Sequence, residues 1–187
     1  MEEILCGNGA AELFFAAVQA VWPQKALVIA PSFSEYEEAL RSVGAEAEYY
    51  YLCEEDNFQI REDYVDKLSE EIDMIFLCNP NNPTGQTIDR DMLIKILDRC
   101  KKQNIVVILD ECFLEFLDEP NRYEMSNLRG EYPNLLIIKA FTKIFSMPGL
   151  RLGYAISSNQ DILEEMSWKL QQWNVSVPAQ MAGVAAL

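Results

Sequence analysis

Apolar residues recur along this chain at two spacings, and the two spacings alternate. Helical spacing, in which apolar positions repeat every three or four residues, occurs over residues 9–22, 34–43, 64–71, 89–103 and 161–172, and begins again near Pro178. Short apolar or tyrosine-rich runs that are typical of strands occupy residues 25–30, 46–52, 74–78, 105–109, 135–139 and 153–157.

Helices and strands that alternate in this way are typical of an α/β domain, in which helices cover a mostly parallel sheet. The run 105–109 is apolar without interruption, as expected for a strand that is covered on both faces. We therefore predict a three-layer α/β/α fold around a mostly parallel, mixed sheet of about seven strands. Half of the 187 residues are hydrophobic and no low-complexity linker divides them, so residues 1–187 are expected to form one domain.

Charge narrows the range of partners. The chain has 15 Lys and Arg against 30 Asp and Glu, which gives a formal net charge of -15. Such an acidic surface argues against nucleic acid or an anionic membrane as a partner. A well-solvated surface on a cytoplasmic protein accounts for most of this charge. No apolar run reaches the roughly 18 residues that a membrane span needs.

Histidine is absent and five cysteines are present. The absence of histidine excludes Ser-His and Cys-His nucleophilic sites and histidine-based metal sites, so no metal is expected. The cysteines show no Cys-x-x-Cys spacing. Cys78 and Cys112 are expected to be buried, small hydrophobic residues in a reducing compartment.

Polar motifs follow three of the predicted strands. The turn Asn79-Pro80-Asn81-Asn82-Pro83-Thr84-Gly85 comes first, then Asp110-Glu111, then a segment that holds Lys143 and Arg151. The carboxyl ends of parallel strands are where open α/β sheets bind ligands. Lys143 is flanked by apolar residues, which we expect to bury its amine, lower its pKa and make it nucleophilic.

These motifs, in this order, resemble the class I/II aminotransferase family of fold-type I enzymes. The resemblance implies pyridoxal phosphate as the cofactor, bound as a Schiff base to Lys143. Asp110 would keep the pyridine nitrogen of the cofactor protonated, and the amine of Lys143, once released by substrate, would move a proton at the substrate Cα. Lys143 and Asp110 are the expected catalytic residues.

The phosphate of the cofactor would be held, by the same resemblance, by Arg151, by Thr142 and by backbone amides at the helix start Gly9-Ala10-Ala11. The family often has a phosphate-binding serine where this chain has Ala140, so binding of the phosphate would depend more on the other ligands. A surface ion pair is the plain alternative for Arg151, and a simple turn is the alternative for the glycine.

The ring of the cofactor would be fixed by Asn82 at its phenolic oxygen and by Phe33 stacked on its face. Turn chemistry also explains Asn82, a core position would explain Phe33, and a structural salt bridge would explain Asp110. Phe113 stands where aminotransferases usually have a tyrosine that donates to the same oxygen. In this respect the chain is similar to the threonine-phosphate decarboxylases of cobalamin biosynthesis, which are relatives of the histidinol-phosphate aminotransferases.

The expected substrate is therefore an amino acid or a phosphorylated amine that reacts at Cα. Decarboxylation of L-threonine O-3-phosphate is the first expectation, and amino-group transfer stays open. Two other classes also stay open: a ligand-sensing domain of a regulator and a doubly wound nucleotide-binding enzyme. Against the second, no G-x-G-x-x-G or Walker-type loop follows a predicted strand.

The resemblance also implies a homodimer with its active site at the subunit interface. It further implies that the chain is the large domain of the enzyme, truncated at both ends, without the small domain and the N-terminal segment. Such a piece is expected to bind the cofactor weakly and to be poorly active alone.

Overall fold

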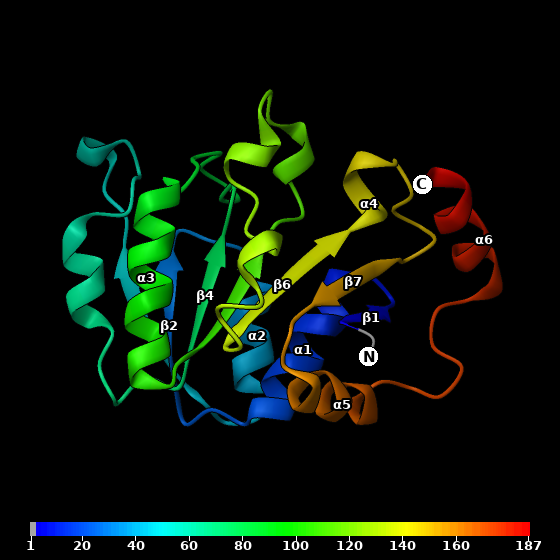
Figure 1. The fold of residues 1–187 in the computed structure, drawn as a ribbon, viewed down its shortest axis with the longest axis horizontal. Coiled ribbons are helices and arrows are strands. Elements are labelled where there is room, and N and C mark those ends of the chain that lie inside the picture. Colours follow the sequence, from blue (N-terminus) through cyan, green and yellow to red (C-terminus); the bar gives the residue numbers. More distant parts are fainter. Residues whose placement is uncertain (1–2) are drawn as a thin grey trace.

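The computed structural model describes residues 3–187, which form a seven-stranded sheet between two layers of helices (Figure 1). The strand order is β1-β7-β6-β5-β4-β2-β3. The strands are β1 (Ile4–Gly7), β2 (Lys25–Ala30), β3 (Glu46–Tyr51), β4 (Met74–Cys78), β5 (Val106–Asp110), β6 (Leu135–Ala140) and β7 (Gly153–Ile156). Strands β2 to β6 are parallel, and β7 runs antiparallel to both β1 and β6. The predicted mixed, mostly parallel α/β fold is confirmed.

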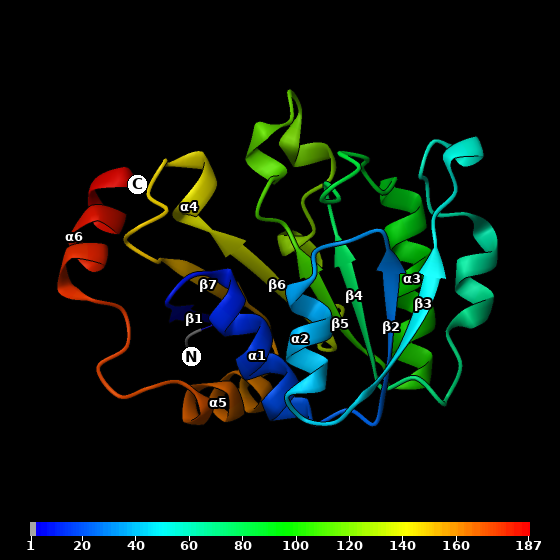
Figure 2. The ribbon, with the colours of Figure 1, turned by 180° about the vertical axis from the view of Figure 1, so that it is seen from behind.

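Helices cover both faces of the sheet. The α-helices of the described residues are α1 (Ala10–Val21), α2 (Glu35–Arg41), α3 (Arg90–Gln103), α4 (Phe141–Ile144), α5 (Gln160–Lys169) and α6 (Val177–Ala186), of which α4 lies at the end of β6 and α6 beyond the sheet (Figure 1). Helix α3 lies on one face, whereas α1, α2 and α5 lie together on the other, as the two opposite views show (Figures 1 and 2).

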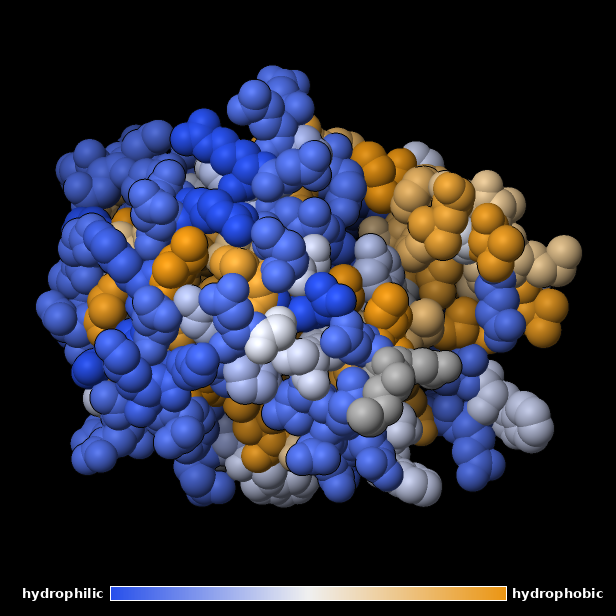
Figure 3. Space-filling model, viewed as in Figure 1, coloured by the Kyte–Doolittle hydropathy of each residue, from blue (hydrophilic) through white to orange (hydrophobic). Residues whose placement is uncertain are grey.

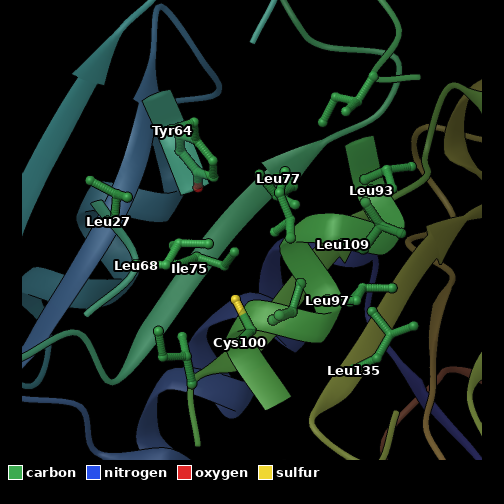
Figure 4. Close-up of a cluster of buried hydrophobic side chains, with 14 of the residues drawn as sticks. Leu27, Tyr64, Leu68, Ile75, Leu77, Leu93, Leu97, Cys100, Leu109 and Leu135 are labelled. Carbon is green, nitrogen blue, oxygen red and sulfur yellow. The ribbon is translucent and has the colours of Figure 1, made fainter. Parts of the chain in front are cut away.

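Strict alternation along the central strands builds two separate cores. In β4, Ile75 and Leu77 join the cluster under α3 (Figure 4), whereas Met74 and Phe76 join the cluster under α1 and α2. Because successive side chains of a strand point to opposite faces, a strand that is covered on both sides must be apolar throughout. Each of these side chains is almost completely buried, which stabilises the fold by roughly 1.5–3 kcal/mol apiece.

Local signals set the ends of the long helices. The carboxylate of Asp89 caps α3 by accepting a hydrogen bond from the backbone N–H of Asp91, and Asn104 ends the helix with φ 57. Helix α1 begins after Gly9, whose φ of 87 favours glycine, and ends at Val21, with Trp22 as its C-cap just before Pro23.

Three expectations about local structure are wrong. The helix expected over 64–71 is a 3-10 helix over Glu62–Lys67, and α5 ends at Lys169, three residues before the expected end. Strand β1 was not located in the sequence, because its four residues alternate too briefly to give a pattern. Among residues 3–187, no helix is both long and apolar enough to cross a bilayer.

Candidate active site

A cavity of about 150 Å³ lies at the carboxyl ends of β4, β5 and β6, beside the start of α1. It is lined by Ala10, Ala11, Phe14, Phe33, Cys78, Asn82, Asp110, Cys112, Phe113, Ala140, Thr142, Lys143 and Arg151. All residues predicted to bind a cofactor are in this set except Gly9, which directly precedes Ala10. Five segments that are separated in sequence thus meet at one place.

Asp110 is the last residue of β5 and is only 5% exposed. Its side chain shares the face of Ile108, toward α1 and α2, because side chains of a strand alternate. Tyr36 Oη donates a hydrogen bond to Oδ2 at 2.6 Å, and the backbone N–H of Cys112 donates to Oδ1 at 2.9 Å. Burial nevertheless raises the pKa of Asp110, since these two neutral donors only partly replace the lost water.

Tyr36 is a site residue that the sequence analysis missed. It is fully buried in α2, and its ring stacks on Phe76 at 4.8 Å. Helical spacing in α2 indicated only a core residue, and nothing in the sequence paired its hydroxyl with a residue 74 positions away. A salt bridge, the plain alternative for Asp110, is not among the ion pairs of the described residues.

Lys143 lies in the short helix α4 and lines the cavity, but the expectation that apolar neighbours bury it is wrong. The residue is exposed. Phe141 and Phe145 stack on each other at 4.9 Å, and Phe141 packs against Tyr154, so these rings do not cover the amine. The aromatic contact of the amine comes instead from Phe113, whose ring centroid lies 5.5 Å from Nζ.

Arg151 also lines the cavity, and it packs directly on Gly9. A Cβ added at Gly9 would lie 2.6 Å from Nη2 of Arg151, so only glycine leaves room for the guanidinium there. Arg151 itself has φ 57, a left-handed conformation that is uncommon for residues other than glycine and that clusters at functional sites. The arginine is exposed, and its Nη1 donates to the carbonyl of Pro148 at 3.2 Å.

Gly153 brings the start of α1 close to the sheet. A Cβ at this position would lie 2.7 Å from both the backbone N of Ala10 and the carbonyl carbon of Gly9. The first amides of α1 are therefore held against β7, close to Arg151. No side chain caps them, because Gly9 occupies the N-cap position. Uncapped amides at a helix start favour an anion.

The remaining wall of the cavity is mainly apolar. Phe33 packs edge-on against Phe14 and Tyr36. The buried thiols of Cys78 and Cys112 belong to this wall, and burial raises the pKa of both, so they stay protonated and unreactive at neutral pH.

A partly buried ion network lies on the opposite face of the sheet, directly behind the site, with Lys139 and Glu111 at its buried centre. Lys139 Nζ lies 3.3 Å from Glu111 Oε2, an ion pair without hydrogen-bond geometry, and donates hydrogen bonds to Glu115 and Glu124 at 3.1 and 3.0 Å. The backbone N–H of Met125 donates to Glu111 at 3.1 Å. The sequence analysis missed this network. It ties the strand end that carries Asp110 to the strand that leads into Lys143.

Burial raises the pKa of Glu111 from 4.5 to about 7, despite the favourable charge of Lys139. At Glu111 the folded protein therefore binds more protons than the unfolded chain between these values, and the contribution of this group to stability falls as the pH rises from 4.5 through 7. We expect this fall to reach about 3 kcal/mol and Glu111→Gln to flatten it. Urea unfolding of both proteins at pH 5, 6, 7 and 8 measures the difference; parallel pH profiles would contradict the expectation.

Comparison with known proteins places these residues in a family. The chain is 36% identical over 184 residues to the threonine-phosphate decarboxylase of Salmonella typhimurium, covering 98% of this chain and 50% of that protein. It is 33% identical to the histidinol-phosphate aminotransferase of Methanosphaera stadtmanae, covering 98% and 48%. The crystal structure of the histidinol-phosphate aminotransferase from Clostridium acetobutylicum matches with a TM-score of 0.89 and 34% identity, over 97% of this chain and 53% of that one.

The chain thus spans about half the length of the relatives that it matches. The family described as aminotransferase class I and II matches residues 1–187. The fold also matches, and the cavity lies at the expected strand ends. This chain therefore belongs to the class I and II aminotransferase family, whose cofactor is pyridoxal phosphate.

Proposed function

We propose that this chain is the large, cofactor-binding domain of a pyridoxal-phosphate enzyme that acts at the Cα of an amino acid or phosphorylated amine. The reaction we favour is decarboxylation of L-threonine O-3-phosphate. The observation that carries the proposal is the single cavity in which a buried carboxylate (Asp110), an amine (Lys143) and a guanidinium (Arg151) meet.

The residues of the cavity fit this cofactor. The backbone of α1 leaves no room for a Cβ at Gly153, and Gly9 has a positive φ and lies against the guanidinium of Arg151; both support a cradle in which the amides of α1 and this guanidinium bind a phosphate. Asp110 has neutral donors only, and its raised pKa indicates a carboxylate that lacks a cationic partner. A protonated ring nitrogen would supply that partner.

Pyridoxal phosphate, when bound, supplies an electron sink that stabilises negative charge at the substrate Cα. The residues of this chain would bind the cofactor and fix its orientation. Arg151, Thr142 and the first amides of α1 would hold the phosphate. Asp110 would provide the fixed negative charge at the buried end of the cavity, Asn82 would donate to the phenolic oxygen, and Phe33 would cover one face of the ring. Lys143 would be the covalent attachment point and would move the proton at Cα.

Phe113 supports the decarboxylase branch. Its ring lies in the cavity wall, under the amine of Lys143, and has no hydroxyl to donate to the cofactor. Threonine-phosphate decarboxylase is also the name of the Salmonella typhimurium relative at 36% identity. Amino-group transfer is the second candidate, because the structure that matches with a TM-score of 0.89 is a histidinol-phosphate aminotransferase.

The proposed enzyme is a homodimer. Helix α6 turns Ala179 and Gly183 inward, yet it presents large apolar side chains to solvent, and these gather on one part of the surface (Figure 3). They are Val177, Met181 and Val184, together with Leu187 just after the helix, each at least 66% exposed. An apolar patch of this kind supports a protein contact.

Borohydride reduction in the presence of pyridoxal phosphate is expected to label Lys143 and no other lysine. The reason is that, among residues 3–187, only this amine lines the cavity, whereas Lys139 is held by three carboxylates. Peptide mass mapping locates the label. Lys143→Arg should abolish it, and the matched variant Lys95→Arg, on the surface of α3, should not. Label spread over several surface lysines would defeat the proposal.

The branch is tested with the full-length enzyme and two substrates. Carbon dioxide released from L-threonine O-3-phosphate, without any keto acceptor, supports the decarboxylase. Turnover that requires a keto acceptor and conserves the carboxylate supports the transaminase instead. A protein that is labelled on Lys143 but turns over neither substrate would favour a ligand-sensing domain.

A further inference from the structure

The carboxylate of Glu12 is held in place by residues from both ends of the chain. The backbone N–H of Asn8 donates to Glu12 Oε2 at 2.7 Å, and the side-chain amide of Asn8 donates to Oε1 at 3.1 Å. The amide of Asn174 donates to Oε2 at 2.9 Å. The amide of Asn8 also donates to Oδ1 of Asn174. All three side chains are partly buried.

The side chain of Glu12 contacts a different backbone amide from the one that is usual at a helix start. Glu12 is the third residue of α1, where a glutamate commonly reaches back to the N-cap amide. Here it reaches one residue further, to Asn8, and packs over Gly7, where a Cβ would lie 3.1 Å from Oε2. The negative charge is thereby drawn away from the amides of Ala10 and Ala11; the N–H of Gly9 already donates to the carbonyl of Gly7 at 2.8 Å.

Asn174 is placed with unusual backbone geometry on the connection between α5 and α6. Its neighbours Trp173 and Val175 have φ of 64 and 62, a left-handed conformation that is an outlier for a β-branched residue such as valine. Backbone strain of this kind persists only where the surroundings enforce it, and it clusters at functional sites. The Oδ1 atom of Asn174 also accepts from the N–H of Val175 at 3.0 Å.

Val175 connects the same segment to the other wall of the cavity. It is buried, and it packs in a cluster with Phe141, Leu152 and Ala179. Phe141 is the first residue of α4, two positions before Lys143. The pair Asn174-Val175 therefore contacts the start of α1 with one side chain and the base of α4 with the next.

We propose that Asn174 and Glu12 are positioning residues for the phosphate of the cofactor. Asn174 fixes the carboxylate of Glu12, Glu12 fixes the amide of Asn8, and the loop that they hold aims the first amides of α1 into the cavity. Neither side chain lines the cavity. This inference rests on the proposed function, because it assigns the phosphate to the start of α1.

The test compares two ligands that differ only in the phosphate group, pyridoxal phosphate and pyridoxal. Asn174→Asp keeps the acceptor for Val175 but sets a second carboxylate against Glu12, and Glu12→Gln is a milder variant. Each should weaken the binding of pyridoxal phosphate about tenfold and leave the affinity for pyridoxal unchanged, because only the phosphate cradle is disturbed. Trp173→Asn is the control, since this side chain is 96% exposed and tolerates the left-handed backbone as asparagine.

Absorbance titration gives both affinities, and thermal unfolding of each variant without ligand reports its fold. A selective loss for pyridoxal phosphate in a folded variant supports the inference. An equal loss for both ligands, or no loss for either, overturns it. The proposed function fails differently: the wild-type protein would then bind pyridoxal phosphate no more tightly than pyridoxal and would show no label on Lys143.

Discussion

Replacing Asp110 with asparagine is expected to remove most of the affinity for pyridoxal phosphate while leaving the fold intact. The carboxylate is 5% exposed, and burial raises its pKa, so its charge is a cost to the protein alone. Only a cationic group on the ligand offsets this desolvation of the carboxylate. We expect the Kd for pyridoxal phosphate to rise about a hundredfold, or about 3 kcal/mol, as for the loss of one partner of a buried ion pair.

The same substitution should leave the thermal midpoint of the ligand-free protein unchanged or higher at neutral pH, because a desolvated charge is removed. Tyr36→Phe is the matched control. It deletes the 2.6 Å hydrogen bond but keeps the charge, so its effect on affinity should be much smaller. Equal losses for the two variants, or a large drop in the ligand-free midpoint of Asp110→Asn, would show that Asp110 serves the fold and not the cofactor.

Lys139→Met is expected to destabilise the protein by about 3–5 kcal/mol at pH 8, since it leaves Glu111 buried without a cationic partner. Burial lowers the pKa of Lys139, but the three surrounding carboxylates more than offset this, and its pKa is raised overall. At pH 5 the loss should be smaller, because Glu111 then takes up a proton. Urea unfolding at the two pH values measures both losses.

Lys95→Met is the control for the loss of a lysine. Lys95 Nζ pairs with Glu62 at 2.7 Å, a shorter distance than that from Lys139 to Glu111, but both partners are largely exposed. Its removal should leave the free energy of unfolding unchanged within error, because water and salt replace an exposed partner. The double variant Lys139→Met with Glu111→Gln should recover part of the stability. If it did not, the loss would come from packing of the lysine stem and not from its charge.

Most of the fold could be read from the sequence because its strands are covered on both faces. Runs such as 74–78 and 135–138 are apolar throughout, and each is bounded sharply by polar residues. Strand β1 was not predicted, because it lies at an edge of the sheet and its four residues are mostly exposed or half-buried. The 3-10 helix over Glu62–Lys67 was mistaken for an α-helix, since one or two turns carry too few positions to separate the two periods.

The candidate site was predictable to the extent that its residues follow strands. Asp110 and Asn82 come at strand ends, so the position of their strands in the sheet fixes where they meet. Tyr36 and Asn174 were not predictable, because a hydrogen bond between distant segments leaves no local pattern. The exposure of Lys143 was missed for a related reason: apolar neighbours in sequence, here Phe141 and Phe145, pack against each other.

Gly153 places a limit on how this domain can change. A Cβ at this position would lie 2.7 Å from the backbone at the start of α1, so a single added methyl group would push helix and strand apart at the point where Arg151 also reaches Gly9. The residues that β7 tolerates therefore depend on those in the Gly9-Ala10 turn, although the two segments are more than 140 positions apart in the chain. Any redesign that enlarges one of them has to begin by reshaping the other.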